Sequence, residues 1–315
     1  MNFYNKILLQ LFFITALINI QAQDLQFTQF YSNPIYLNPA FAGSNYCPRI
    51  IFNYRNQWPN LSGTYVTYSA SYDQYIKSMG GGIGFLFTTD DQARGTLKTT
   101  TASFIYSYNA RITREFSINT ALQATYFQKN LDRSKLNFGD MIDPRRGFVW
   151  NTNEIIPAQS KYNADFSAGI LGYSKRYFFG FAANHITQPD EGLLGVSKLP
   201  AKFTLHCGTM IEIEKHTSYL SPNILFQQQA KFTQLNLGLY YVRNVFVAGI
   251  WYRNNDAVIL LVGLQNKQFK FGYSYDVTIS KLAGNTAGSH EISIQIQFNC
   301  KPPRIHYRPI SCPVF

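Results

Sequence analysis

From residue 49 onward, apolar and polar residues alternate along segments of about ten residues that end in turn-forming residues. The segment 291–298 reads EISIQIQF, so its even positions are all apolar and its odd positions are all polar. Because neighbouring side chains of a strand point to opposite faces, such a segment has one apolar and one polar face. We predict fourteen strands of this kind: 49–58, 63–75, 81–89, 96–110, 115–129, 161–173, 176–188, 200–212, 218–229, 232–242, 245–253, 256–265, 268–279 and 289–298.

An even number of alternating strands indicates an all-β, antiparallel, up-and-down β-barrel that spans the outer membrane. Charged residues make up 14% of the chain, against roughly 25% in soluble domains, which disfavours a soluble β-sandwich. No apolar run of about 20 residues follows residue 22, which disfavours a bundle of membrane helices. If the N-terminus is periplasmic, the predicted inner turns are short, and the longest loop, 130–160, lies outside the cell, as in other barrels.

The first 48 residues lack this alternation and divide into two parts. Residues 1–22 have the layout of a secretory signal peptide, with a cationic Lys6, an apolar stretch and a small Ala22 before the expected cleavage point. Residues 23–48 carry three prolines and many aromatic side chains, and are too apolar for a solvated tail. We predict that they form an irregular plug in the lumen or a periplasmic cap below it. The barrel then occupies 49–299, and 300–315 form a periplasmic tail.

The sequence offers little sign of catalysis or nucleic-acid binding. The chain has a formal net charge of +11. Its basic residues are scattered, often at turns, and are not concentrated in one stripe, so no nucleic-acid partner is expected. The histidines lack metal-ligand spacing, and the glycine run 80–84 opens a strand, whereas nucleotide-binding loops open a helix. We predict no enzyme, no cofactor and no small-molecule substrate. The remaining alternative is an outer-membrane lipid-processing enzyme whose catalytic triad combines residues that are far apart in the sequence.

Four cysteines are placed unevenly along the chain, and the periplasm permits disulfides. Closure of the barrel pairs the first strand with the last, which brings Cys47 and Cys300 to the same end. Cys312 follows on the short tail and could pair with either, so three outcomes stay open: Cys47–Cys300, a bridge that uses Cys312, or no bridge. Cys207 lies in the middle of a strand beside His206, and we predict a reduced, buried thiol there.

Several stretches resemble one family. They are 26–43 (QFTQFYSNPIYLNPAFAG), 53–59 (NYRNQWP), 199–206 (LPAKFTLH), 251–253 (WYR), 288–292 (GSHEI) and 312–315 (CPVF). Together they resemble the PorP/SprF family of Bacteroidetes outer-membrane barrels, which is tied to the type IX secretion system. The resemblance implies a subunit that assists export or cell-surface attachment of large adhesins, and in some members gliding motility. Its partners would be secretion components, an adhesin and membrane lipid. A small-solute channel is the alternative function.

The candidate functional residues lie within these stretches. Arg55 and Gln57 share one face of the first strand, and we place that face in the lumen because an arginine on the lipid face is costly. The full set of candidate lumenal or partner contacts is Tyr36, Asn38, Phe41, Arg55, Gln57, Arg253 and Glu291.

Overall fold

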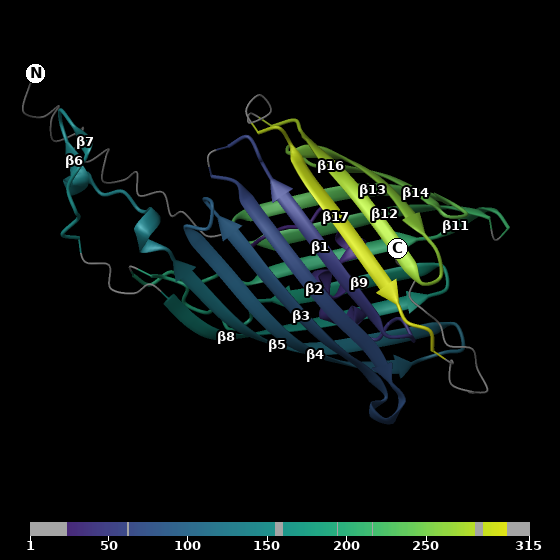
Figure 1. The fold of residues 1–315 in the computed structure, drawn as a ribbon. Helices are drawn as coiled ribbons and strands as arrows, with labels where there is room; N and C mark the ends of the chain where they lie inside the picture. Colours follow the sequence, from purple (N-terminus) through teal and green to yellow (C-terminus); the bar gives the residue numbers. More distant parts are fainter. Residues whose placement is uncertain are drawn as a thin grey trace, which may run out of the picture.

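The computed structural model describes residues 24–300 except 62, 155–159, 194, 216 and 281–285. Within that part of the chain, fourteen antiparallel strands wind around a lumen (Figure 1). The strands are β1 (Arg49–Gln57), β2 (Tyr65–Ile76), β3 (Gly81–Gln92), β4 (Leu97–Arg111), β5 (Phe116–Leu131), β8 (Ser160–Ser174), β9 (Tyr177–Asn184), β10 (Lys202–Thr209) with its continuation β11 (Ile211–Glu214), β12 (Ser218–Gln229), β13 (Phe232–Arg243), β14 (Phe246–Arg253), β15 (Ala257–Gln265), β16 (Phe269–Thr278) and β17 (Ser289–Gln297).

The sheet closes on itself through its first and last strands. β1 pairs with β17 from Arg49 opposite Gln297 to Gln57 opposite Ser289, and every other strand pairs with its neighbours in the chain. The predicted fourteen-stranded barrel is therefore confirmed. We call the end where β1 begins the inner end, because the loop lengths predict that it faces the periplasm, and the opposite end the outer end.

Two segments differ from the prediction. The strand predicted at 176–188 ends at Asn184, because His185 turns the chain with a positive φ of 56°. The long 130–160 loop, predicted without strands, contains a short hairpin of β6 (Ile142–Asp143) and β7 (Gly147–Phe148), which projects away from the barrel (Figure 1). Three short 3-10 turns lie outside the lumen: η3 (Lys77–Met79), η4 (Arg133–Lys135) and η5 (Gly139–Met141).

The outer surface of the barrel is apolar, in contrast to a soluble protein. On β5, Leu122 is 70% exposed and Tyr126 is exposed as well, whereas Asn119 and Ala121, on the opposite face of the strand, are buried against the lumen. The same two-residue period runs along the other strands. This arrangement puts apolar side chains where lipid tails would surround them, as expected of a membrane-spanning barrel. No helix among the described residues is long and apolar enough to cross a membrane.

The N-terminal segment lies inside the barrel (Figure 1) and forms three short turns: η1 (Phe30–Ser32), α2 (Pro34–Leu37) and η2 (Pro39–Phe41). Each Asn-Pro step starts one of them, with proline at the first positions, where its missing N–H is not needed. The Asn38 side chain also accepts a hydrogen bond from the Ala40 N–H, as a helix N-cap does. Of the two positions that the sequence left open, plug or cap, the structure has the plug.

The plug turns the middle and inner lumen into a packed core. Its side chains Phe30, Tyr31 and Ile35 are almost fully buried, and apolar residues of the barrel wall pack around them. Each large apolar side chain buried in this way stabilises the fold by about 1.5–3 kcal/mol. The wall contributes Leu86, Ile105, Ala121, Leu171, Tyr173, Phe178, Leu225, Tyr240, Trp251, Ile259 and Leu261.

Candidate functional site

Glu291 on β17 fixes the plug to the wall of the lumen. Its side chain is fully buried, and its two carboxylate oxygens accept the backbone N–H groups of Thr28 at 2.6 Å and Gln29 at 3.0 Å. The Gln29 side chain donates in return to the Glu291 carbonyl at 2.9 Å. A buried carboxylate that accepts two backbone N–H groups holds the chain in one register. Glu291 therefore anchors residues 28 and 29.

Arg55 extends this anchor into a buried charge cluster. Its guanidinium donates to Thr28 Oγ1 at 2.8 Å and contacts Glu291 at 3.2 Å and Asp276 at 3.1 Å. Arg253 lies 3.6 Å from the same Asp276 carboxylate. Arg253 also lies 3.1 Å from the more exposed Asp256 carboxylate. Each buried charge of the cluster therefore has a partner of opposite charge, which offsets the cost of its burial. The structure thus brings together Arg55, Arg253 and Glu291, three of the residues singled out in the sequence.

Asn38 and Phe41 hold the middle of the plug against β8, β9 and β10. The Asn38 amide donates to the carbonyl of Ile170 at 3.1 Å and lies 3.1 Å from His206 Nε2. The ring of Phe41 stacks on His206 at 5.3 Å between centroids. His206 therefore faces the lumen, so the adjacent Cys207 faces outward. The prediction of a buried Cys207 thiol is wrong, because alternation exposes its side chain on the outer surface.

A second polar cluster holds the beginning of the described chain near the outer end, and we call it the latch. It comprises Asp24, Asp165, His185, Lys202 and Gln229. The His185 ring bridges two carboxylates, with Nε2 2.8 Å from Asp24 and Nδ1 2.7 Å from Asp165. Lys202 lies 3.4 Å from Asp24, and Gln229 donates to it at 3.1 Å.

Tyr36 joins the latch to the rest of the plug. Its hydroxyl donates to the Leu25 carbonyl at 2.5 Å, and the Lys202 ammonium lies over its ring at 5.4 Å from the centroid. The latch, Tyr36 and the Glu291 anchor together hold the segment 24–29 across the lumen.

The latch should respond to alkaline pH. His185 lies just beyond β9, and burial opposes its charged form, but Asp24 and Asp165 outweigh burial and raise its pKa from 6.5 to about 10. Because the pKa is raised, the protonated His185 stabilises the latch fully below pH 6.5. This stabilisation is lost as the pH rises toward 10. We expect brief current bursts through a reconstituted barrel to become more frequent across this range. A His185→Gln barrel should show no such rise, and an equal rise in both proteins would contradict the assignment to His185.

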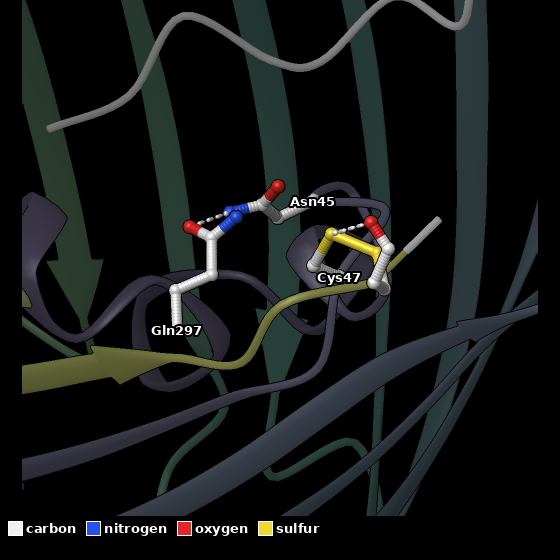
Figure 2. Close-up of a disulfide and its surroundings, with 4 residues drawn as sticks. Asn45, Cys47 and Gln297 are labelled. Carbon is white, nitrogen blue, oxygen red and sulfur yellow. Dashed lines mark hydrogen bonds between the residues drawn. A yellow bond between two sulfur atoms is a disulfide. The ribbon is translucent and has the colours of Figure 1, made fainter. Parts of the chain in front are cut away.

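A disulfide joins the plug to the closing strand at the inner end (Figure 2). It links Cys47, just before β1, to Cys300, just after β17, with the two Cα atoms 5.4 Å apart. Beside it, the Asn45 amide donates to Gln297 at 2.9 Å. The structure therefore has the pairing that barrel closure suggests. Cys312, with the rest of the tail, lies outside the described residues, as does the expected signal peptide.

Loss of this disulfide should destabilise the barrel. The bridge spans 253 positions, and restraining so long a loop in the unfolded chain stabilises a protein by about 2–4 kcal/mol. We expect Cys47→Ser to lower the free energy of unfolding by that amount in denaturant titrations of the detergent-solubilised barrel. Cys207→Ser, which changes an exposed thiol, is the matched control and should have no effect. Equal stability of Cys47→Ser and the unchanged protein would show that the bridge does not restrain the chain.

Glycines let the plug approach the wall closely. A Cβ atom at Gly82 would lie only 2.5 Å from the Ala42 carbonyl oxygen and from the Gly43 Cα. Gly43 itself has a φ of +65°, a conformation that favours glycine. The run 80–84, expected to be a turn and strand entry, does start β3 after the left-handed Gly80. Its lack of side chains also makes room for residues 42 and 43.

A cavity of about 920 Å³, lined by both polar and apolar side chains, occupies the outer part of the lumen. Gln57 lines it, together with hydroxyl side chains of β2 to β5 and the latch residues other than Gln229. The exposed turn residues Asn254 and Asn255 mark its rim. Its floor includes Asp24, Leu25 and Gln26 of the plug. No group of three metal-ligating side chains occurs among the described residues. The lumen is thus packed in its middle and inner parts and hollow at its outer end.

The sequence comparisons identify the family. Residues 19–296 match the family model described as type IX secretion system membrane protein PorP/SprF. The chain belongs to this family. The match covers nearly all of the barrel and the plug, so the PorP/SprF resemblance seen in the short motifs is confirmed. No curated protein matches the chain at a significant level.

Among solved structures, this PorP/SprF chain is similar to outer-membrane proteins. Omp33 of Acinetobacter baumannii aligns with a TM-score of 0.47 and 7% identity over 81% of this chain and all of that one. The KdgM porin aligns with a TM-score of 0.39 and 8% identity over 80% of this chain and 99% of that one. A mutant porin of Rh. blastica gives a TM-score of 0.33 and 6% identity over the same shares. The family match, and not these distant likenesses, decides the assignment.

Proposed function

We propose that this protein is a non-enzymatic subunit that assists export or surface attachment of a large adhesin through type IX secretion. Membership of the PorP/SprF family supports the link to secretion. The observation that favours a partner protein over a conduit is the plug, which Glu291, Asn38 and the Cys47–Cys300 bridge hold in the lumen. A folded adhesin has no path through this lumen. The adhesin instead crosses elsewhere, and this barrel acts on it at the membrane.

Gene deletion with surface proteomics tests this proposal. We expect the deletion strain to lose one or a few large surface proteins while other type IX cargo still reaches the surface, and in a gliding organism to spread more slowly. Complementation with the wild-type gene should restore both properties. An unchanged set of surface proteins would contradict the proposal.

A small-solute channel is the second candidate, and the cavity at the outer end favours it. Solutes would have to pass the apolar core around Phe30 and Ile35, which fills the lumen below the cavity. We therefore expect the protein to be nearly silent in a planar lipid bilayer. A steady, porin-like current through the unmodified protein would favour the channel.

A further inference from the structure

In the part of the chain that the structure describes, the cavity lies at the outer end of the lumen and is closed below. Around its rim lie the outer ends of the strands and the turn at Asn254 and Asn255, whereas the plug and its apolar core close it below. The disulfide and the Arg49–Asp73 ion pair, 2.6 Å between Nε and Oδ1, tie the chain at the inner end. With the predicted orientation, a ligand of this cavity comes from outside the cell.

One side of the cavity has a wall of hydroxyl and amide groups, and the charged side chains of Asp90 on β3 and Lys129 on β5 line the cavity nearer the outer ends of these strands. Thr88 and Thr101 share a hydrogen bond of 2.5 Å across β3 and β4, and Ser103 and Thr125 share one of 2.8 Å across β4 and β5. The Gln123 amide donates to both Ser103 and Thr125. Each hydroxyl has one donor and two acceptor sites, so capacity remains for a ligand. Peptide groups, with one donor and one acceptor per residue, match such a wall.

The lumen already binds one polypeptide through its backbone. In the plug, residues 24–27 have no regular secondary structure. The Asp24 N–H donates to Gln229 Oε1 at 3.1 Å, the Leu25 carbonyl accepts from Tyr36, and the Thr28 N–H donates to Glu291. The cavity continues directly from the end of this segment. Side chains of this lumen thus hydrogen-bond to a polypeptide backbone, and a second segment that enters from outside would be bound in the same way. This precedent favours a polypeptide ligand over a saccharide.

We propose that the outer cavity is a binding site for an irregular polypeptide segment of the exported surface protein. The segment enters from outside and lies against the hydroxyl wall of β3 to β5, above the plug. This inference rests on the proposed role in adhesin attachment and adds the place of contact. It gives the barrel a means of holding a large protein at the surface without letting it pass.

Site-specific photocross-linking in living cells tests the location. The photoreactive residue p-benzoylphenylalanine replaces Thr125, which lines the cavity, or the adjacent Tyr126, which is exposed on the outer surface. We expect position 125 to link to the surface protein whose display depends on this gene, and position 126 not to link to it. Links from position 125 to saccharide alone, or to no exported protein while display is normal, would overturn the inference.

Filling the cavity tests its importance. Thr101→Trp puts a large side chain into the cavity, and Ala102→Trp puts the same side chain on the exposed outer face of the same strand. We expect Thr101→Trp to reduce the attached surface protein by about tenfold or more, equivalent to about 1.4 kcal/mol of binding free energy. Ala102→Trp should leave it unchanged, with equal amounts of both barrels in the membrane. Normal attachment with Thr101→Trp, in a strain where gene deletion abolishes it, would refute the cavity site and leave the proposed function standing.

Discussion

Deleting residues 24–46 is expected to turn a nearly silent barrel into an open pore. The deletion removes Phe30, Ile35 and Phe41 from the lumen but keeps the strands and the Cys47–Cys300 bridge. Since the barrel hydrogen bonds lie within the wall, the strands should still insert, although the newly wetted apolar wall lowers stability. Single-channel recording in planar bilayers measures the result as a large, steady rise in conductance.

A deletion of residues 140–150 is the control for this experiment. It removes the external β6–β7 hairpin, which lies away from the lumen (Figure 1), and should leave the barrel silent. If the plug deletion also leaves conductance unchanged, residues 24–46 do not close the lumen.

Arginine scanning on β5 should show opposite outcomes at neighbouring positions. Leu122 is near the middle of the strand and points outward, whereas Gln123 lines the cavity. We expect Leu122→Arg to destabilise the barrel by about 2–4 kcal/mol, because a cation then faces the lipid near the midplane. Gln123→Arg puts the cation into the cavity, away from lipid, and should change stability little. Denaturant unfolding in lipid vesicles gives both values.

Similar destabilisation by the two substitutions would show that the inward and outward faces of β5 have been assigned wrongly. Both substitutions introduce the same side chain, arginine, at adjacent positions of one strand. The comparison therefore isolates the direction in which each side chain points.

The barrel was predictable because its signal is local. Alternation with a period of two can be read within each ten-residue segment, and it set the number of strands. The inward face of Arg55 followed instead from the cost of an arginine on the lipid face. Closure of an even-stranded sheet is a topological consequence of that count, and it brought Cys47 beside Cys300. The order of the strands needed no further information, since each pairs with its neighbour in the chain.

The apolar core inside the barrel was not predictable from alternation. Lumen-facing Ile105, Leu171 and Trp251 are apolar because the plug covers them, whereas a water-filled lumen would favour polar groups there. Each of them interrupts an inward face that also carries polar residues, as Ile105 does between Ser103 and Ser107, and such an interruption is a signal that could have been read as contact with an internal segment. The latch was missed for a different reason, because Asp24 and His185 are 161 positions apart and no local pattern relates them.

An engineered disulfide tests most directly whether the plug lies against the wall inside the lumen. A Cβ atom at Gly84 on β3 would lie 3.3 Å from the Cβ atom of Ala42 in the plug, close to the mean of about 3.8 Å between Cβ atoms in disulfides. We expect the double variant Ala42→Cys/Gly84→Cys to form this bond in native outer membranes, as seen by peptide mapping without reduction. The Cys47–Cys300 peptide serves as the internal standard for a folded barrel. Free thiols at positions 42 and 84, in protein that contains the Cys47–Cys300 bond, would contradict a lumen filled by the N-terminal segment.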